Sequence, residues 1–451
     1  MKDLSMRIIN ARSAGIDVGS RFHVVAVDQR SENVRQFGVY SEDQQAMIKW
    51  LKLHQIQTIA MESTGNYWQT LFDALQRAGF EVQLVNGNQT KNVKGKKTDV
   101  LDCLWIQKLH SLGLLNGSFL PAAEIQSLRT YHRHRIHLIE QCSRYINKMQ
   151  KAMRLMNIRL DVVLNDVMGQ SGRLIIEAIL AGERDSDKLA SLANYRVKKS
   201  RGEIAKALIG NWRNDLLFEL RRCLTLHDVY CQEIKECDHQ LETAIKNLLP
   251  HSTTTTDFKY AKATKQRNKY MPEFDIERFS WQYYGVNLME IQGVGNGTIL
   301  SFLTQIGDRI NQFPSSKHFC NWLRLAPNNK ITGGKVISSR TPKGKNPLSL
   351  ALRQAANAIG NQKEGELVNF FKRVAYRKDR ASAITATARK LAVIIYNMVT
   401  KRENYKPSSP VPLSDKVKNK IIKNIRTRVE ALELTKEQLN FLFQATSFST
   451  A

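Results

Sequence analysis

Two acidic residues near the amino terminus occupy positions where a charge is costly. Asp17 lies between Ile16 and Val18 in an apolar stretch, and Glu62 ends the apolar run 59–61. A carboxylate in such surroundings needs a compensating partner, because an isolated buried charge is strongly destabilised. A bound cation would supply that compensation.

A second pair of acids opens the segment 98–110, which reads TDVLDCLWIQKLH. Thr98 can cap a helix there, and Asp99 and Asp102 then lie three residues apart on one helix surface. Acids in a first turn also suit the helix dipole, so this pair alone does not establish a metal site. Apolar residues at helical spacing predict one buried face, formed by Val100, Leu101, Leu104, Trp105 and Leu109.

The four carboxylates come from separate segments and can converge. Hard oxygen ligands in this number suit Mg²⁺, and two such ions about 4 Å apart stabilise the attacking and leaving oxygens of phosphodiester reactions. We therefore expect metal-dependent chemistry on nucleic acid at Asp17, Glu62, Asp99 and Asp102. A basic loop directly before the second pair would hold the anionic strand through Lys91, Lys94, Lys96 and Lys97.

The charge balance indicates the same partner. The 451 residues carry a formal net charge of +27, which attracts a polyanion over long distances. No apolar run approaches the roughly 18 residues of a membrane-spanning helix. The amino terminus also lacks the continuous apolar core of a secretion signal, so we expect a cytoplasmic protein that associates with the nucleoid and not with a membrane.

Six cysteines are scattered along the chain without a CxxC pair, which favours reduced, buried thiols. Cys231, Cys237 and His239 could be imagined as zinc ligands. Their spacing on one continuous helix does not converge them on a tetrahedron, so the sequence gives little support to that interpretation.

The elements that position the acids follow from hydrophobic alternation. Strands are expected over 15–20, 23–28 and 34–40, then a helix from residue 41, a strand over 58–62, a helix over 67–78 and a strand over 80–85. Three hairpin strands followed by alternating helices and strands predict an α/β domain with a mixed sheet, over residues 1–117.

Long helices are expected next, over 118–249. Apolar residues from Leu128 to Met156 recur at alternating steps of three and four, with Arg135 in a polar position, and a second such stripe runs from Leu217 to Leu248. This pattern is typical of a coiled coil, and it leaves open whether the stripes pair within one chain or between chains. Arg144 and Lys148 lie on the basic outer face of the first stripe and are candidate nucleic-acid contacts.

Residues 250–284 are polar and basic and predict a linker, followed by a mainly α-helical domain over 285–405 and a helical tail over 406–451. Gly293 and Gly295 precede a helix and would let backbone N–H groups approach a phosphate. Further phosphate contacts are expected from Lys335, Arg340, Lys343 and Lys345.

Several motifs together resemble one family. The order GIDVGS, AMESTGNYW, NVKGKKTDVLD resembles the RuvC-like, ribonuclease-H-type domain of the DEDD transposases of bacterial insertion sequences. The blocks 322–358 and 381–399 resemble the carboxy-terminal domain of the same family. By this likeness Asp17, Glu62, Asp99 and Asp102 match the acidic tetrad of a transposase that cleaves and rejoins donor and target DNA. The resemblance also implies a structured guide RNA encoded by the element, and assembly into homodimers or homotetramers.

One position departs from that family. Thr332 stands where the family carries its catalytic serine, and we expect its hydroxyl to be the nucleophile, presented by a loop made flexible by Gly333 and Gly334. Ser338 and Ser339 are competing hydroxyls. Two other functions remain open: a junction endonuclease that only hydrolyses DNA, and a non-catalytic nucleic-acid scaffold.

Overall fold

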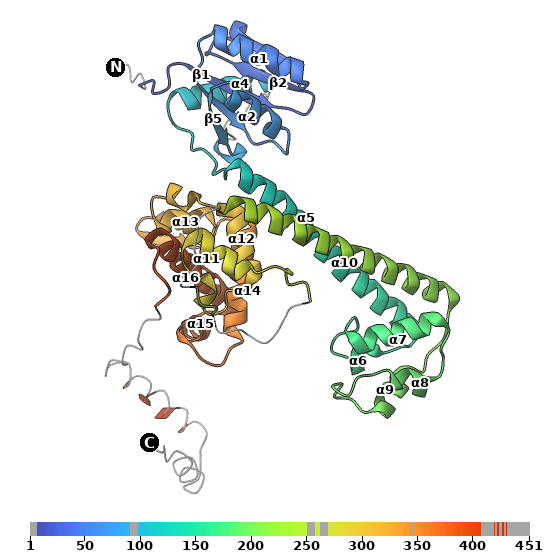
Figure 1. The fold of residues 1–451 in the computed structure, drawn as a ribbon. Helices are drawn as coiled ribbons and strands as arrows, with labels where there is room; N and C mark the ends of the chain where they lie inside the picture. Colours follow the sequence, from blue (N-terminus) through green and yellow to red (C-terminus); the bar gives the residue numbers. More distant parts are fainter. Residues whose placement is uncertain are drawn as a thin grey trace. The chain divides into compact units, whose positions relative to one another are not determined.

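The protein is described by a computed structural model that covers residues 7–90, 98–249, 258–261, 269–344 and 346–406, together with 419, 422–423, 426–427 and 430. The chain divides into two compact units, Met1–Leu120 and Pro121–Ala451, and each is described by itself (Figure 1). Most of the helical tail predicted over 406–451 lies outside the described residues.

The first unit contains a five-stranded mixed sheet, as the sequence predicts. Its strand order is β3-β2-β1-β4-β5. β1 pairs antiparallel with β2, and β2 with β3, whereas β1–β4 and β4–β5 are parallel. The strands are β1 Ser13–Val18, β2 Phe22–Ala26, β3 Val34–Gly38, β4 Thr58–Glu62 and β5 Glu81–Val85.

The two faces of this sheet are covered by different helices. α1 (Ser41–Leu53) and α2 (Trp68–Arg77) share a core with Ala14, Ile16 and Val18 of β1. Successive residues of a strand point to opposite faces, so Ser13, Gly15 and Asp17 point to the other face. That other face is covered by α4 (Asp99–Ser111), which packs against β1, β2 and β4.

Gly15 sets how closely α4 approaches the sheet. A Cβ at this position would lie 2.3 Å from the backbone nitrogen of Gln107 and 2.6 Å from the carbonyl oxygen of Cys103. The Gln107 amide donates to the carbonyl oxygen of Ser13 at 3.2 Å, and the His110 ring lies 2.9 Å from the hydroxyl of Thr58. The carboxyl end of α4 is therefore fixed at the start of β1 and β4.

The buried face of α4 differs from the predicted one. It consists of Cys103, Ile106, Gln107 and His110, whereas Val100 and Leu101 are 40% and 52% exposed. The backbone of α4 comes closest to the sheet at Cys103 and Gln107, which lie against Gly15 of β1. The side of α4 that carries these two residues therefore faces the sheet. The five apolar residues that the sequence predicted to be buried are only partly buried or exposed.

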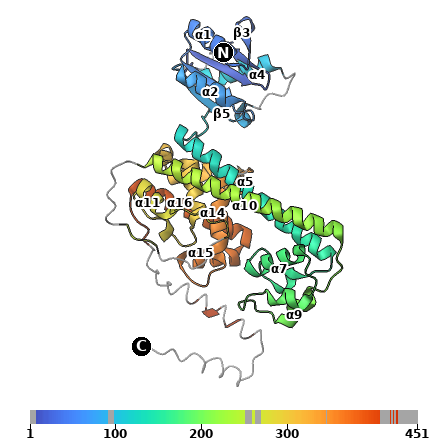
Figure 2. The ribbon, with the colours of Figure 1, turned by 45° about the vertical axis from the view of Figure 1, so that its right-hand side comes forward.

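The second unit begins with two long helices, α5 (Ala123–Leu155) and α10 (Asn214–Leu248), which pack side by side (Figure 2). They are antiparallel, because Arg135 pairs with Asp238 whereas Cys142 lies against Cys231. The two apolar stripes predicted from sequence thus face each other within one chain. Four short helices lie between them in sequence: α6 Leu160–Val163, α7 Gln170–Ala181, α8 Ser186–Ser191 and α9 Arg201–Ala207.

The rest of the second unit is mainly α-helical. Its helices are α11 Ile276–Tyr284, α12 Asn296–Ile306, α13 Ser316–Trp322, α14 Pro347–Gly360, α15 Glu366–Arg377 and α16 Arg380–Lys401, with 3-10 turns at Leu288–Glu290 and Arg309–Gln312. The linker predicted over 250–284 is shorter than expected, because Ile276, Ser280 and Tyr284 bury one face of α11. Across the described residues, none of the helices is both long and apolar enough to cross a membrane.

A buried ion pair crosses the two long helices. Arg135 Nε lies 2.5 Å from Asp238 Oδ1, both side chains are about 5% exposed, and Arg135 also donates to the carbonyl oxygen of Tyr270 at 2.8 Å. Removing one partner of such a pair leaves an uncompensated buried charge and costs roughly 3–5 kcal/mol, whereas replacing both by apolar residues is often neutral.

We therefore predict that Arg135→Met lowers the free energy of unfolding by about 3–5 kcal/mol and that Arg135→Met with Asp238→Leu recovers most of the loss. Urea denaturation of the full chain measures both. Arg154→Met, which removes the exposed pair with Asp161, is the control and should cost at most about 1 kcal/mol. A double variant as unstable as the single one would contradict this account.

Candidate active site

Asp17 and Glu62 are neighbours at the carboxyl ends of two adjacent parallel strands. Ile16 of β1 pairs with Met61 of β4, so Asp17 and Glu62 are the next residues in that register. Adjacent strands lie about 4.8 Å apart, and residues in register point to the same face. Both acids lie on the face that α4 covers, since Ala60, two residues before Glu62, packs against Ile106 of α4.

The amino terminus of α4 lies at the same end of the sheet, because this helix runs antiparallel to β1. Asp99 and Asp17 line one pocket of about 180 Å³, together with residues of the β1–β2 turn. Burial, and then the negative charge of Asp17, raise the pKa of the Cys103 thiol to about 12, and Asp102 adds in the same direction. Asp17, Asp99 and Asp102 therefore share one neighbourhood. Thr98 caps the helix as predicted, its hydroxyl accepting from the Leu101 N–H at 3.3 Å.

Glu62 is held by a short helix that the sequence did not predict, α3 (Gly87–Thr90). The Thr90 hydroxyl donates to Glu62 Oε2 at 2.8 Å. A Cβ at Gly87 would lie 2.4 Å from Glu62 Oε1, so a side chain here would displace the carboxylate from its present position. Gly87 and Thr90 therefore position Glu62. In the sequence, the one sign of this role was a glycine two residues after the strand that ends at Val85.

The four carboxylates gather at one end of the sheet without forming a closed ligand cluster. Within the described part of the chain, the one group of three or more His, Cys, Asp or Glu whose ligand atoms all lie within 4.8 Å of one another is Cys142, His227 and Cys231. The chemistry of the acidic donor set fits a hard divalent cation, since all four residues offer carboxylate oxygens. Lys91, Lys94, Lys96 and Lys97, predicted to lie beside these acids, fall outside the described residues.

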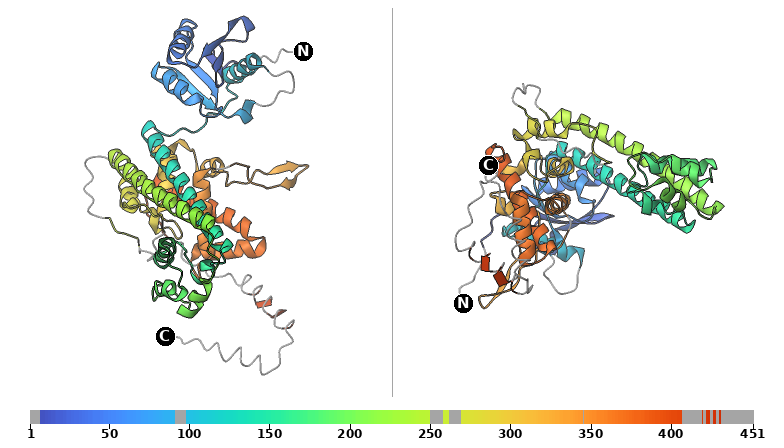
Figure 3. Two further views of the ribbon diagram at one scale, coloured as in Figure 1. Left: turned by 90° about the vertical axis from the view of Figure 1, so that its right-hand side faces the viewer. Right: turned by 90° about the horizontal axis from the view of Figure 1, so that it is seen from below.

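Thr332 lies in a tight hairpin and not in a flexible loop. It ends β6 (Lys330–Thr332) and pairs with Lys335, the first residue of β7 (Lys335–Ser338). Gly333 and Gly334 have φ values of +53° and +76°, the left-handed conformation that a two-residue hairpin turn of type I′ requires at both positions. The glycines therefore serve turn geometry. Figure 3 shows this hairpin projecting from the helices around it, and its residues from 330 to 337 are exposed.

The basic residues predicted to contact phosphates lie on the surface, as far as the structure describes them. Lys335, Arg340 and Lys343 are exposed on the hairpin and on the segment after it, whereas Lys345 lies outside the described residues. Arg144 and Lys148 of α5 line a wide, open groove of about 550 Å³ with Lys151.

The two glycines before α12 have different surroundings. A Cβ at Gly293 would lie 2.4 Å from Ile359, so this glycine is required for packing against α14. Gly295 has open space at its Cβ position and is the residue directly before α12. Of the pair, Gly295 is the one whose surroundings leave room for a phosphate.

A mixed sheet with acids at the ends of neighbouring strands, and a helix that brings two more acids to the same end, fits the RuvC-like, ribonuclease-H-type class of domain.

Comparison with models of known protein families identifies the family of this chain. A transposase model for the DEDD domain of the IS110 type matches residues 14–158, and the model described as transposase IS116/IS110/IS902 family matches residues 286–371. The chain belongs to the IS110-type DEDD transposases, whose activity is the cutting and rejoining of DNA. A search of curated proteins finds no match.

Gly87→Ala tests the placement of Glu62. The new methyl group would displace the carboxylate, and a misplacement of about 1 Å in a catalytic group can cost roughly 100-fold in rate, so we expect a 10- to 100-fold loss of DNA cleavage. Single-turnover cleavage on a donor-end duplex measures this. Gly202→Ala, at a helical glycine with open space around it, is the matched control and should keep the wild-type rate. Unchanged cleavage in Gly87→Ala would show that Glu62 needs no such positioning.

Proposed function

We propose that this protein is an insertion-sequence transposase that cleaves and rejoins DNA at a Mg²⁺ site held by Asp17, Glu62, Asp99 and Asp102, with the Thr332 hydroxyl as nucleophile. The observation that carries the proposal is the register of β1 and β4, which makes Asp17 and Glu62 neighbours at the end of the sheet to which α4 brings Asp99 and Asp102. The family supports the reaction class.

Each part of the chain has a separate role in this proposal. Mg²⁺, when bound, would lower the energy of charge that develops on the phosphate and on the attacking and leaving oxygens. Asp17, Glu62, Asp99 and Asp102 hold that cation, and Thr90 and Gly87 orient Glu62. Thr332 supplies a hydroxyl on an exposed hairpin, where a DNA strand can reach it.

The chemistry has two balanced steps. In the first, Thr332 Oγ1 attacks a phosphorus, loses its proton, and displaces a deoxyribose oxygen that leaves as a hydroxyl. In the second, a deoxyribose hydroxyl of another strand attacks the threonyl phosphodiester and releases Thr332 with its proton. The number of phosphodiesters is conserved, so no external energy source is required.

DNA contacts are proposed at two places in the second unit. The exposed cations Lys335, Arg340 and Lys343 would hold the strand that Thr332 attacks. The basic groove at Arg144 and Lys148 suits a second phosphate backbone, which we assign to an element-encoded structured RNA. We also propose that the protein assembles into homodimers or homotetramers, as the family resemblance implies.

The rival functions differ in the intermediate that they form. An endonuclease that only hydrolyses would activate water at the acids and leave Thr332 unmodified. A non-catalytic scaffold would bind nucleic acid without cleaving it. A covalent bond between protein and DNA separates the proposed transposase from both.

Trapping that bond tests Thr332. We expect wild-type protein to form a covalent adduct on a nicked suicide substrate, Thr332→Ala to lose it, and Thr332→Ser to retain or increase it, because removing the methyl group relieves crowding at the attacking oxygen. Ser338→Ala, four residues from the hairpin turn, is the matched control and should retain the adduct. Peptide mapping identifies the residue, and an adduct on Ser338, or one undiminished in Thr332→Ala, would refute the assignment.

Asp17→Asn separates catalysis from binding. The amide is a weaker cation ligand of nearly the same size, so cleavage should fall by roughly 10³-fold or more, given that metal stabilisation of such reactions amounts to several kcal/mol. Binding of the same duplex, measured by fluorescence anisotropy, should change by less than about threefold, since phosphate contacts come from basic residues. Asp73→Asn, an exposed acid on α2, is the control. Wild-type cleavage that persists in EDTA would rule out the cation site.

A further inference from the structure

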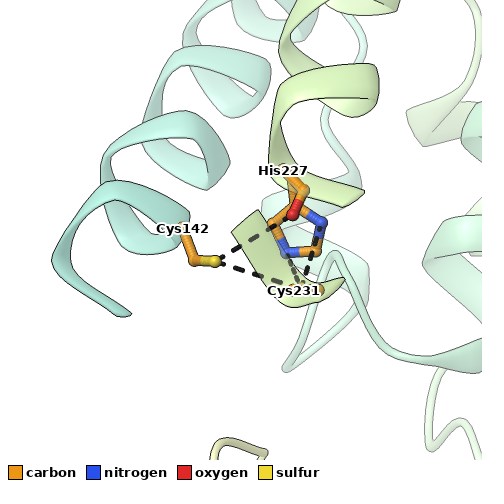
Figure 4. Close-up of side chains that lie close together, drawn as sticks. All are labelled: Cys142, His227 and Cys231. Carbon is orange, nitrogen blue, oxygen red and sulfur yellow. Dashed lines mark hydrogen bonds between the residues drawn. The ribbon is translucent and has the colours of Figure 1, made fainter. Parts of the chain in front are cut away.

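Two thiols and an imidazole meet between the two long helices of the second unit. Cys142 comes from α5, whereas His227 and Cys231 come from α10, one helical turn apart and on the side that faces α5 (Figure 4). Cys142 and His227 are buried and Cys231 is half-buried. One ligand atom from each of the three residues lies within 4.8 Å of the other two.

The separations match the edges of a tetrahedral metal site. Zinc binds thiolate sulfur at about 2.3 Å and imidazole nitrogen at about 2.0–2.1 Å, which places ligand atoms roughly 3.8 Å apart for two sulfurs and roughly 3.6 Å apart for sulfur and nitrogen. The sulfurs of Cys142 and Cys231 lie 3.9 Å apart, and Cys231 Sγ lies 3.7 Å from His227 Nε2. Both separations measured from Cys231 Sγ therefore match those of a tetrahedral site.

A second observation concerns the orientation of the histidine. His227 Nδ1 lies 3.3 Å from Asp228 Oδ1, and Arg173 holds that carboxylate through two bonds of 2.5 and 2.8 Å. A metal-binding histidine almost always donates its other ring N–H to a carboxylate or carbonyl, which leaves the opposite nitrogen free to bind.

A buried hydroxyl packs in the same apolar cluster as Cys142 and Cys231. This hydroxyl is Tyr270 Oη. Its backbone is fixed, because its carbonyl oxygen accepts from Arg135 at 2.8 Å. Tyr270 therefore places a polar group next to the two thiols.

We propose that Cys142, His227 and Cys231 bind a soft divalent cation, Zn²⁺ or its equivalent, that joins α5 to α10. The set considered from the sequence was a different one, Cys231 with Cys237 and His239, and that set had little support in the sequence. Cys237 packs against Leu138, Ile234 and Cys142, but it is not among the three residues whose ligand atoms meet. The ligand that the sequence missed, Cys142, comes from a position 89 residues before Cys231. The site is chemically distinct from the acidic one, because thiolate and imidazole select soft cations and carboxylates select hard ones.

Cobalt titration tests this site on the full chain. Metal-free protein prepared under reducing conditions should bind one equivalent of Co²⁺ with a sulfur-to-cobalt charge-transfer band and intense visible bands of tetrahedral coordination. Cys142→Ser and Cys231→Ser should each weaken the charge-transfer band by about half or abolish binding, and His227→Asn should abolish the tetrahedral spectrum. Cys237→Ser is the matched control, because Cys237 lies on the same helix as His227 and Cys231 but is not one of the three proposed ligands. This variant should keep the wild-type spectrum.

Two results would overturn the proposal. The first is a wild-type titration with no charge-transfer band, or one unchanged in Cys142→Ser. The second is a Cys142–Cys231 disulfide, found by mass spectrometry in protein isolated without reductant, together with less than a tenth of an equivalent of zinc in protein isolated under reducing conditions. The wild-type titration stands by itself should a variant fail to fold. DNA cleavage is not part of the readout, so the result is independent of the proposed function.

Discussion

The close contact between α4 and β1 is the constraint on which the candidate active site depends. The backbone of α4 touches the sheet at Gly15, where any side chain would collide with Cys103 and Gln107. This contact, with the anchoring of Gln107 on Ser13 and of His110 near Thr58, fixes the axis of the helix along β1. Because the helix runs antiparallel to the strand, its acidic first turn lies at the end of the sheet where Asp17 and Glu62 emerge. Sheet register and helix packing thus assemble acids from three distant segments.

The second unit uses polar contacts to fix its long helices. The ion pair of Arg135 with Asp238 sets the antiparallel register of α5 and α10, and the cluster of Cys142, His227 and Cys231 lies two turns further along α5. Arg135 also holds Tyr270, so one buried side chain connects the helix pair to the segment that follows α10. α5 also contacts α12, because the ring of His132 on α5 lies 2.9 Å from the Thr304 hydroxyl on α12. These contacts join the helix pair to the domain that carries the Thr332 hairpin.

The sequence predicted what depends on local pattern. Alternation and turn residues located the five strands, and Thr98 marked the start of α4 correctly. The buried face of α4 was predicted wrongly, because hydrophobicity favours Val100 and Leu101, whereas backbone contact through a glycine decides which stripe meets the sheet. Gly87 and Thr90 were missed since their role, holding Glu62, arises only after folding. The hairpin at Thr332 was taken for a flexible loop, although paired glycines between exposed strands are also the signal of a tight turn.

The central claim is that DNA passes through a covalent bond to the protein and is rejoined without hydrolysis. The most direct test is the stereochemistry at phosphorus, followed with a donor strand that carries a single phosphorothioate of known configuration at the cleaved position. Two in-line displacements, first by Thr332 and then by a DNA hydroxyl, each invert the phosphorus, so the account predicts joined DNA with overall retention of configuration. Joined DNA with inverted configuration would show a single displacement and would contradict the account.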